Sequence, residues 1–478
     1  MEFTLNDKSI GFDGDKQLSL LSYLREQQQL TSVKDGCSGQ GACGACLVEI
    51  DGKAVLACRT PMEKVAGSNI VTIEGFPTHL KETLGKAFVE KGAVQCGFCT
   101  PGFLSRTRIL LQKNPDPTRE EIKKALTLHM CRCTGYVKIV DAILLAAHSL
   151  RENKEIVLQG SGKIGQSLPK YDAYQKAIGQ SDFIADMHRE NMAYGALTFS
   201  KFPRARVIRI NTTAAEALPG VLRVFTSWDI PGERITGHLK DDWPLMINEG
   251  ETTRYIGDVL AGVVAKTEAM ARAAADLVVV EYEELEPLTD MMAAEHSPIQ
   301  VHEQGNLLSV TCFQNGKQID AILSGSAHVV SATYKTQRVE HGFLETEAAI
   351  AEPWGNDGLR IFVQSQGISE DCRCITRILN LPREKVDVTL IPCGGAFGGK
   401  EDMTVQGHAA LFAYLLKQPI RVRLNREESL RMHPKRHPMI MNYQLGCDNE
   451  GRLTALKADI VGDTGAYASL GEKVMGRA

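Results

Sequence analysis

The sequence predicts a multidomain fold of the α+β and α/β classes, because three stretches of the chain carry different patterns of apolar residues. Residues 1–76 contain short alternating apolar runs and one helical stretch around Leu18–Gln28. Residues 78–152 show helical patterns only, and strands alternate with helices over about 185–290. The length of 478 residues agrees, since roughly 150 residues per domain gives about three domains.

Eight of the thirteen cysteines lie in the first 133 residues, in two blocks of four. The first block occupies the small-residue run GCSGQGACGAC and a position after a hairpin predicted at Asp51-Gly52; its members are Cys37, Cys43, Cys46 and Cys58. Small residues let backbone N–H groups approach sulfide and thiolate, which favours an iron–sulfur cluster over the alternatives, structural zinc or disulfides. Five residues separate Cys37 from Cys43 where the plant-type pattern has four, so Cys37 departs most from that pattern.

The second block consists of CGFC and CRC, with the members Cys96, Cys99, Cys131 and Cys133. Three predicted helices surround it: about 102–113, from Thr118 to about Met130, and Val137–Leu150. Thr100 is predicted as N-cap with Pro101 as the first helical residue, and Thr118 with Glu121 predicts a capping box. Two helix ends would then offer two cysteines each to one metal site. CxC pairs are uncommon for zinc, which again favours a cluster.

QCGFCTPG and CRCTGY, with thirty-one residues between Cys99 and Cys131, resemble the all-helical [2Fe-2S] domain of the molybdenum hydroxylases. This is the xanthine dehydrogenase and aldehyde oxidoreductase family, whose chains open with a plant-type ferredoxin domain. The resemblance covers the whole chain. Together with the apolar patterns it implies a β-grasp ferredoxin-like domain (1–76), an all-helical [2Fe-2S] domain (78–152), a linker (153–180), an α/β hammerhead domain (181–295) and a partial first molybdopterin-binding domain (305–478). No FAD-domain-like segment intervenes, so the layout is flavin-free or the flavin belongs to another subunit.

A glycine-rich loop, IPCGGAFGGKED, follows a predicted strand (Val386–Ile391) and precedes a predicted helix (about 404–417). From Gly394 to Lys400 it satisfies GxxxxGK, but a phosphate-binding loop needs Ser or Thr next, and the chain has Glu401. Nucleotide hydrolysis is therefore excluded.

The same loop resembles the GGxFGGKE loop of the hydroxylases, which passes its backbone beside the molybdenum centre. The resemblance implies cofactor-binding roles for Gln366, Gly394, Gly395, Phe397 and Gly398, with Gln366 and Phe397 in the vicinity of the metal. It also implies that Glu401 faces the substrate. The alternatives are a solvated or capping glutamine at 366 and a salt-bridged surface glutamate at 401.

Three further features carry weaker signals. His341 in VEHGFLE is predicted to be packed or hydrogen-bonded rather than a ligand, and Cys372 and Cys374 are predicted as structural thiols. The basic run RMHPKRHP (431–438) is compatible with a surface patch or an anion contact.

Composition sets the remaining expectations. A net charge of −4 and 43% hydrophobic residues describe an ordinary globular protein without a basic patch for nucleic acid. The sequence lacks an apolar run of about eighteen residues, so no membrane span is expected. MEFTLNDKSIGF predicts a strand rather than a signal peptide, and free cysteines suit a reducing compartment, so the predicted location is cytoplasmic.

The resemblance implies a molybdopterin-dependent hydroxylase that oxidises a purine, another N-heterocycle or an aldehyde, with water as the oxygen source. Electrons would pass from molybdenum to the helical-domain cluster, then to the ferredoxin-like cluster, then to an acceptor protein or flavin subunit. A non-catalytic electron-transfer protein is the alternative, and a zinc-stabilised interaction protein is a third class.

The sequence stops after GDTGAYASLGEKVMGRA, within what resembles the first molybdopterin-binding domain. In the family, the remainder holds further pterin contacts, a substrate-binding arginine and the glutamate that acts as general base, so the base is expected beyond Ala478. Three hypotheses compete: a fragment or frameshifted product, a separate C-terminal molybdenum subunit, or a UGA codon recoded as selenocysteine. The complete protein is expected to form a homodimer.

Overall fold

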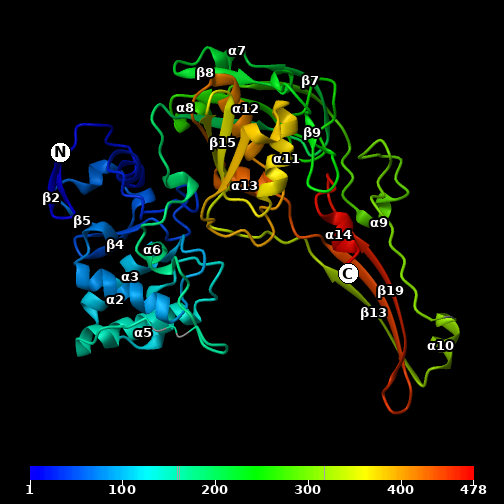
Figure 1. Ribbon diagram of the computed structural model, residues 1–478, viewed down its shortest axis with the longest axis horizontal. Helices are drawn as coiled ribbons and strands as arrows, with labels where there is room; N and C mark the ends of the chain where they lie inside the picture. Colours follow the sequence, from blue (N-terminus) through cyan, green and yellow to red (C-terminus); the bar gives the residue numbers. More distant parts are fainter. Residues whose placement is uncertain (159, 161, 317, 478) are drawn as a thin grey trace.

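The computed structural model describes residues 1–158, 160, 162–316 and 318–477, and it has the predicted α+β and α/β multidomain architecture. Figure 1 shows two small modules at the N-terminal end, coloured blue and cyan, beside a larger body built on a mixed sheet. A three-stranded arm extends from that body towards the lower right of the view. We call residues 1–76 the N-terminal module and residues 78–152 the helical module.

The N-terminal module is built on a five-stranded sheet with the order β2–β1–β5–β3–β4. Its strands are β1 (Glu2–Leu5), β2 (Lys8–Gly11), β3 (Leu47–Ile50), β4 (Lys53–Leu56) and β5 (Asn69–Val71). The predicted hairpin is confirmed, because Asp51 and Gly52 both have positive φ (49° and 71°) between the paired strands β3 and β4. The helix predicted around Leu18–Gln28 is instead a short α1 (Leu20–Ser22) that continues as a π-helical turn (Tyr23–Gln27).

The helical module contains α2 (Thr78–Glu90), α3 (Thr100–Lys113), α4 (Arg119–Ala125) and α5 (Val137–Glu152). The capping box of Thr118 and Glu121 is confirmed. The prediction of Thr100 as N-cap is wrong, because the Cys99 carbonyl already accepts the first helical hydrogen bond, from Phe103 N–H at 3.3 Å. Cys99 is therefore the N-cap of α3, and Pro101 is its second residue instead of its first.

The helix predicted to run to Met130 ends earlier, at Ala125. The reason is tertiary, because residues 126–130 turn towards the N-terminal module, where Met130 N–H donates to the Cys43 carbonyl at 2.9 Å. A helical path to Met130 would not place this donor against the cysteine loop.

The segment predicted as a linker, residues 153–180, is more than a connection. It carries α6 (Ala173–Ala177), whose residues Ala173 and Ala177 are buried in the core of the helical module. Tyr174 lies directly on α2, since a Cβ atom at Gly85 would come 2.8 Å from the Tyr174 ring. The sparse apolar residues of this segment are therefore enough to hold it against the helices.

The body contains a seven-stranded sheet with the order β16–β15–β14–β17–β6–β11–β8. Its strands are β6 (Ala193–Phe199), β8 (Val221–Phe225), β11 (Val259–Ala265), β14 (Ala348–Trp354), β15 (Gly358–Val363), β16 (Val386–Leu390) and β17 (Ile420–Arg423). Strand β17 pairs with β6 in parallel, so one sheet joins the two regions that the sequence predicts as separate domains, 181–295 and 305–478. The main core of the body lies between this sheet, α11 (Ile368–Leu379) and α12 (Gln406–Leu416).

The two predicted strand–helix–strand units exist, as β7 (Ala205–Asn211), α7 (Thr213–Glu216) and β8, and as β11, α8 (Glu268–Ala275) and β12 (Val279–Glu284). The strands of a unit do not pair with each other. Instead β7 pairs with β12 and β8 with β11, both antiparallel, because the units interleave rather than follow one another along a parallel sheet.

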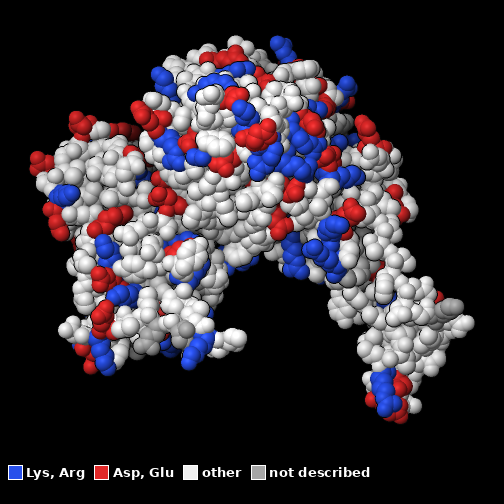
Figure 2. Space-filling view, in the orientation of Figure 1, with Lys and Arg blue, Asp and Glu red and all other residues white. Residues whose placement is uncertain are grey.

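The arm consists of β13 (His328–Thr336), β18 (Met439–Cys447) and β19 (Leu453–Gly462), with α10 (Ile319–Gly325) against it and α14 (Gly471–Met475) near its base. Figure 2 shows few charged side chains along the arm except at its tip. Val330, Tyr334, Leu453 and Leu456 are among its exposed apolar residues. Within the described ranges, no helix has the length and apolar character needed to cross a membrane.

Candidate functional site

The first four predicted cysteines converge in the N-terminal module. Cys37, Cys43 and Cys46 are buried and Cys58 is half-buried, and their thiols hydrogen-bond to one another. Hydrogen bonds from Cys43 and Cys58 lower the pKa of Cys37, and a hydrogen bond from Cys58 lowers that of Cys46. The sequence thus brings all four sulfur atoms to one place.

The second set, Cys96, Cys99, Cys131 and Cys133, converges in the same way. The Sγ atoms of Cys133 and Cys96 lie 3.4 Å apart. Hydrogen bonds from the Cys133 and Cys99 thiols lower the pKa of Cys131 to about 2, and the Thr134 hydroxyl also donates to its Sγ at 3.1 Å. In each set the four thiols therefore lie within hydrogen-bond distance of one another, as ligands of one metal centre must.

The two sets are joined by a short path. The Cys43 carbonyl accepts the Met130 N–H, and Met130 directly precedes Cys131. The modules approach closely here because Gly44 has no side chain; a Cβ atom at Gly44 would lie 2.5 Å from the Leu128 carbonyl oxygen. One peptide hydrogen bond and one peptide unit thus connect a cysteine of one set to a cysteine of the other.

The glycine-rich loop is held by two buried residues, Glu345 and Lys400. Gly394 N–H donates to the Glu345 carboxylate at 2.6 Å, and Glu345 N–H donates back to the Gly394 carbonyl at 3.3 Å. The Lys400 ammonium donates to the Glu345 carbonyl at 2.9 Å and to the Gln364 side chain. Burial raises the pKa of Glu345 to about 7. Lys400 therefore points into the protein, unlike the lysine of a phosphate-binding loop.

Gln366 lies at the other end of the same loop. Its Oε1 accepts from Gly398 N–H at 3.0 Å and from Lys400 N–H at 3.4 Å, so it caps the loop as one alternative predicted. Its amide nitrogen has no partner among the described residues and stays available as a donor at an exposed position. The structure thus brings Gln366 beside Gly398, as the resemblance implies.

Phe397 protrudes from the loop, with 46% of its surface exposed and a positive φ of 56°. Gly395 and Gly398 also have positive φ, 99° and 86°. The space over Gly398 is open, because the nearest atom to a Cβ at this position would be 4.0 Å away, at His341. Close backbone approach by a bulky group is therefore possible on this face.

The helical module touches the glycine-rich loop through Phe98, which belongs to the CGFC turn. A Cβ atom at Gly394 would lie 2.9 Å from the Phe98 ring, and one at Gly36 would lie 3.5 Å from it. Arg132, between Cys131 and Cys133, donates to the His341 carbonyl at 2.8 Å. The second cysteine set therefore lies between the first set and the loop.

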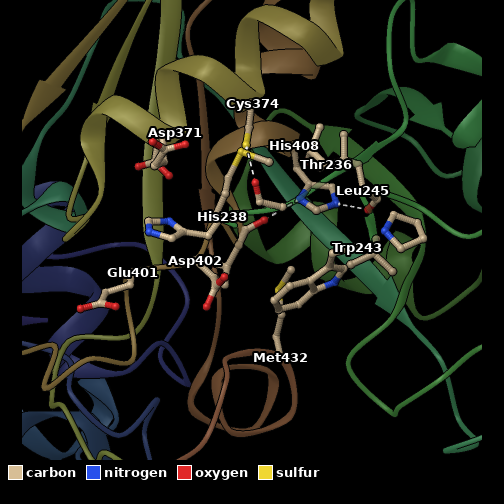
Figure 3. A pocket seen from close by; sticks show the side chains of 16 residues that line it. Thr236, His238, Trp243, Leu245, Asp371, Cys374, Glu401, Asp402, His408 and Met432 are labelled. Atoms are coloured by element: carbon tan, nitrogen blue, oxygen red, sulfur yellow. Dashed lines mark hydrogen bonds between the residues drawn. The ribbon is translucent and has the colours of Figure 1, made fainter. Parts of the chain in front are cut away.

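Glu401 lines a pocket next to the loop, shown in Figure 3. Its side chain is half-buried and has no ion-pair partner in the described part of the chain, which removes the main support for a salt-bridged surface role. Figure 3 shows its carboxylate directed away from Trp243 and His408, at the edge of the pocket. Deeper in the same pocket, burial raises the pKa of Asp371 to about 7.

Most of the remaining predicted features have structural roles, although Cys374, predicted as a structural thiol, is a buried residue that lines the pocket of Figure 3. His341 stacks on Phe343, as expected for a packed residue, and Cys372 is buried in the core of the body. The basic run is not a surface patch at its centre, because the His433 side chain is fully buried 2.9 Å from Glu340 and 3.0 Å from Glu347. Its neighbour Lys435 also pairs with Glu340, at 3.1 Å.

The residues fit the cofactors that the sequence predicts. Thiol–thiol hydrogen bonds link all four cysteines of each set, and the loop offers an open face, free backbone space and the Gln366 amide. Among the described residues, no group of three or more His, Cys, Asp or Glu side chains is arranged to hold a single metal ion.

Three contributors escaped the sequence analysis. Phe98, Met130 and Lys400 link the cysteine sets to each other and to the loop, but none carries a motif of its own beyond lying next to one. The segment VEHGFLE gives no local sign that Glu345 holds the loop. A buried glutamate cannot be told from an exposed one by sequence position alone.

Four family profiles match the chain. They are described as 2Fe-2S iron-sulfur cluster binding domain (3–66), [2Fe-2S] binding domain (72–144), aldehyde oxidase and xanthine dehydrogenase a/b hammerhead domain (178–286) and molybdopterin cofactor-binding domain (301–478).

Individual relatives agree with these profiles. The aldehyde oxidoreductase of Megalodesulfovibrio gigas is 34% identical over 96% of this chain and 53% of its own length. The nicotinate dehydrogenase large molybdopterin subunit of Eubacterium barkeri is 36% identical over 66% of this chain and 74% of its own length. The solved aldehyde oxidoreductase from Desulfovibrio gigas superposes with a TM-score of 0.94 at 31% identity, covering all of this chain and 55% of that one. The chain thus spans about half the length of the aldehyde oxidoreductases that it matches.

Proposed function

Because the chain belongs to the xanthine dehydrogenase and aldehyde oxidoreductase family of molybdenum hydroxylases, we propose that it works in an enzyme that hydroxylates a small molecule. The predicted cofactors, two [2Fe-2S] clusters and a molybdopterin cofactor, are confirmed by the matched domains. Substrates would be aldehydes, purines or other N-heterocycles, with water as the oxygen source. Electrons would leave one at a time.

The observation that carries the proposal is the position of the helical module. It contacts the glycine-rich loop through Phe98 and the first cysteine set through Met130. We propose that Cys96, Cys99, Cys131 and Cys133 hold the inner cluster, and that Cys37, Cys43, Cys46 and Cys58 hold the outer one. An electron then has a packed protein path from the loop to the outer cluster.

The chain's own residues would prepare the site before any reaction. When bound, the molybdenum cofactor supplies the oxygen-transfer and two-electron redox chemistry. Gln366 would orient it with its free amide N–H, and Gly398 would admit it closely. Glu401 would face the substrate, while Glu345 and Lys400 keep the loop in shape from behind.

Partners belong to the same proposal. Relatives with subunit names, such as the Eubacterium barkeri subunit, support an assembly of several polypeptides. We propose that an electron acceptor protein or flavin subunit takes the electrons. We also propose a polypeptide that corresponds to the unmatched half of the aldehyde oxidoreductases, and a homodimer as the complete form.

The test is metal analysis of the protein purified from its native host, combined with its intact mass and anaerobic substrate addition. We expect about four irons per chain, molybdenum, a brown colour and bleaching of the visible absorbance by an aldehyde or N-heterocycle. Four irons without molybdenum and without bleaching would instead establish an electron carrier. A colourless protein would overturn both.

A further inference from the structure

A strap formed by residues 170–179 lies directly on the CGFC turn. The Lys170 ammonium donates to the Gln95 carbonyl at 3.4 Å. Gly97 has a positive φ of 85°, and a Cβ atom there would lie 2.6 Å from the Lys176 Cβ. The aliphatic stem of Lys176 therefore covers the turn between Cys96 and Cys99.

The strap brings net positive charge to this turn. Lys176 is only 7% exposed, and its ammonium lies 2.7 Å from an Asp172 carboxylate oxygen. Lys170 forms an ion pair with the same carboxylate. Two ammonium groups and one carboxylate leave one positive charge, held in a partly buried setting where solvent screens it weakly.

The position of Lys176 does not depend on its own charge. Ala173, Ala177 and Ile178 of the strap are buried in the core of the helical module, and Tyr174 packs on Gly85 of α2. A neutral side chain of similar length at 176 should therefore leave the strap in place.

We propose that Lys176 sets the reduction potential of the cluster held by Cys96, Cys99, Cys131 and Cys133. This rests on the proposed function, because it requires a cluster on those four thiols. Reduction adds one electron to the cluster and makes or breaks no bond. A nearby positive charge stabilises the more negative reduced form, so Lys176 favours the arrival of an electron at the inner cluster.

The experiment is a redox titration of the whole purified chain with dithionite, followed by electron paramagnetic resonance of the two clusters. For Lys176→Met we expect a loss of about tenfold in the equilibrium constant for reduction of one cluster, equivalent to 59 mV for one electron. Asp172→Asn should shift the reduction potential of the same cluster in the opposite direction, to a higher value. Lys176→Arg, which keeps the charge, should restore the wild-type value.

Two internal controls accompany these variants. Lys113→Met removes an exposed charge at the C-terminal end of α3 and should leave the reduction potentials of both clusters unchanged. The outer cluster should titrate unchanged in every variant.

The inference is overturned if Lys176→Met leaves both potentials unchanged, or if it shifts them no more than Lys176→Arg. It is also overturned if Lys176→Met and Asp172→Asn shift the potential in the same direction, because that result indicates loosening of the strap rather than an effect of charge. A wild-type chain without any iron–sulfur signal would overturn the proposed function itself, which is a different outcome.

Discussion

Replacing Gly44 by alanine is expected to open the contact between the N-terminal and helical modules. Gly44 has φ +73°, where an L-residue costs about 1–2 kcal/mol. In addition, the new Cβ would lie 2.5 Å from the Leu128 carbonyl oxygen, closer than real Cβ contacts occur. The loop from Leu128 to Met130 must therefore retreat, and the 2.9 Å hydrogen bond from Met130 to the Cys43 carbonyl is lost, at about 0.5–1.5 kcal/mol.

Gly67→Ala is the matched control, because Gly67 has φ +72° and nothing within 4 Å of its Cβ position. Both variants carry the same backbone strain, so their difference isolates the contact between the modules. Hydrogen exchange of the Met130 amide measures the strength of this contact directly. A difference of about 1.4 kcal/mol corresponds to roughly tenfold faster exchange in Gly44→Ala than in Gly67→Ala.

Equal exchange at Met130 in the two variants would refute this reasoning. It would mean that the loop accommodates the methyl group without giving up its hydrogen bond to Cys43. Slower electron transfer between the clusters in Gly44→Ala alone would extend the result to function.

Three further predictions concern stability. Asp186→Asn removes the carboxylate that the buried Lys34 ammonium shares with Arg25 and should cost about 3–5 kcal/mol in urea denaturation. Lys34→Met combined with Asp186→Asn should recover the part of this loss that comes from the unpaired Lys34 ammonium, and equal losses in the two variants would contradict that ion pair. Thr118→Ala removes the capping box with Glu121 and should cost about 1 kcal/mol, seen as faster hydrogen exchange confined to α4; unchanged exchange would contradict it. Burial raises the pKa of Asp371 from 3.8 to about 7, so between pH 4 and 7 the folded protein holds a proton that the unfolded chain releases. The unfolding free energy of the wild type relative to Asp371→Asn should therefore fall as pH rises through this window, and a flat difference would count against the burial of this carboxyl.

Features that depend on neighbouring residues were predictable from the sequence. The Asp51-Gly52 hairpin needs only two residues that tolerate positive φ, and the capping box needs only Thr118 and Glu121. The cysteine spacings and the glycine-rich loop were recognisable for the same reason, since each site is assembled from short segments. Helix ends were less predictable. Helix α4 ends at Ala125, and the chain after it turns so that Met130 N–H donates to the Cys43 carbonyl of the N-terminal module.

The amino-acid sequence by itself determined the order of the modules, the two sets of thiols and the loop that accompanies them. Only the tertiary structure decided how they meet. Lys176 lies on Gly97, Asp186 pairs with Lys34, and strand β17 joins β6 across more than two hundred residues. Such contacts depend on which apolar surfaces pack together. A local pattern of residues does not specify which distant segment it will contact.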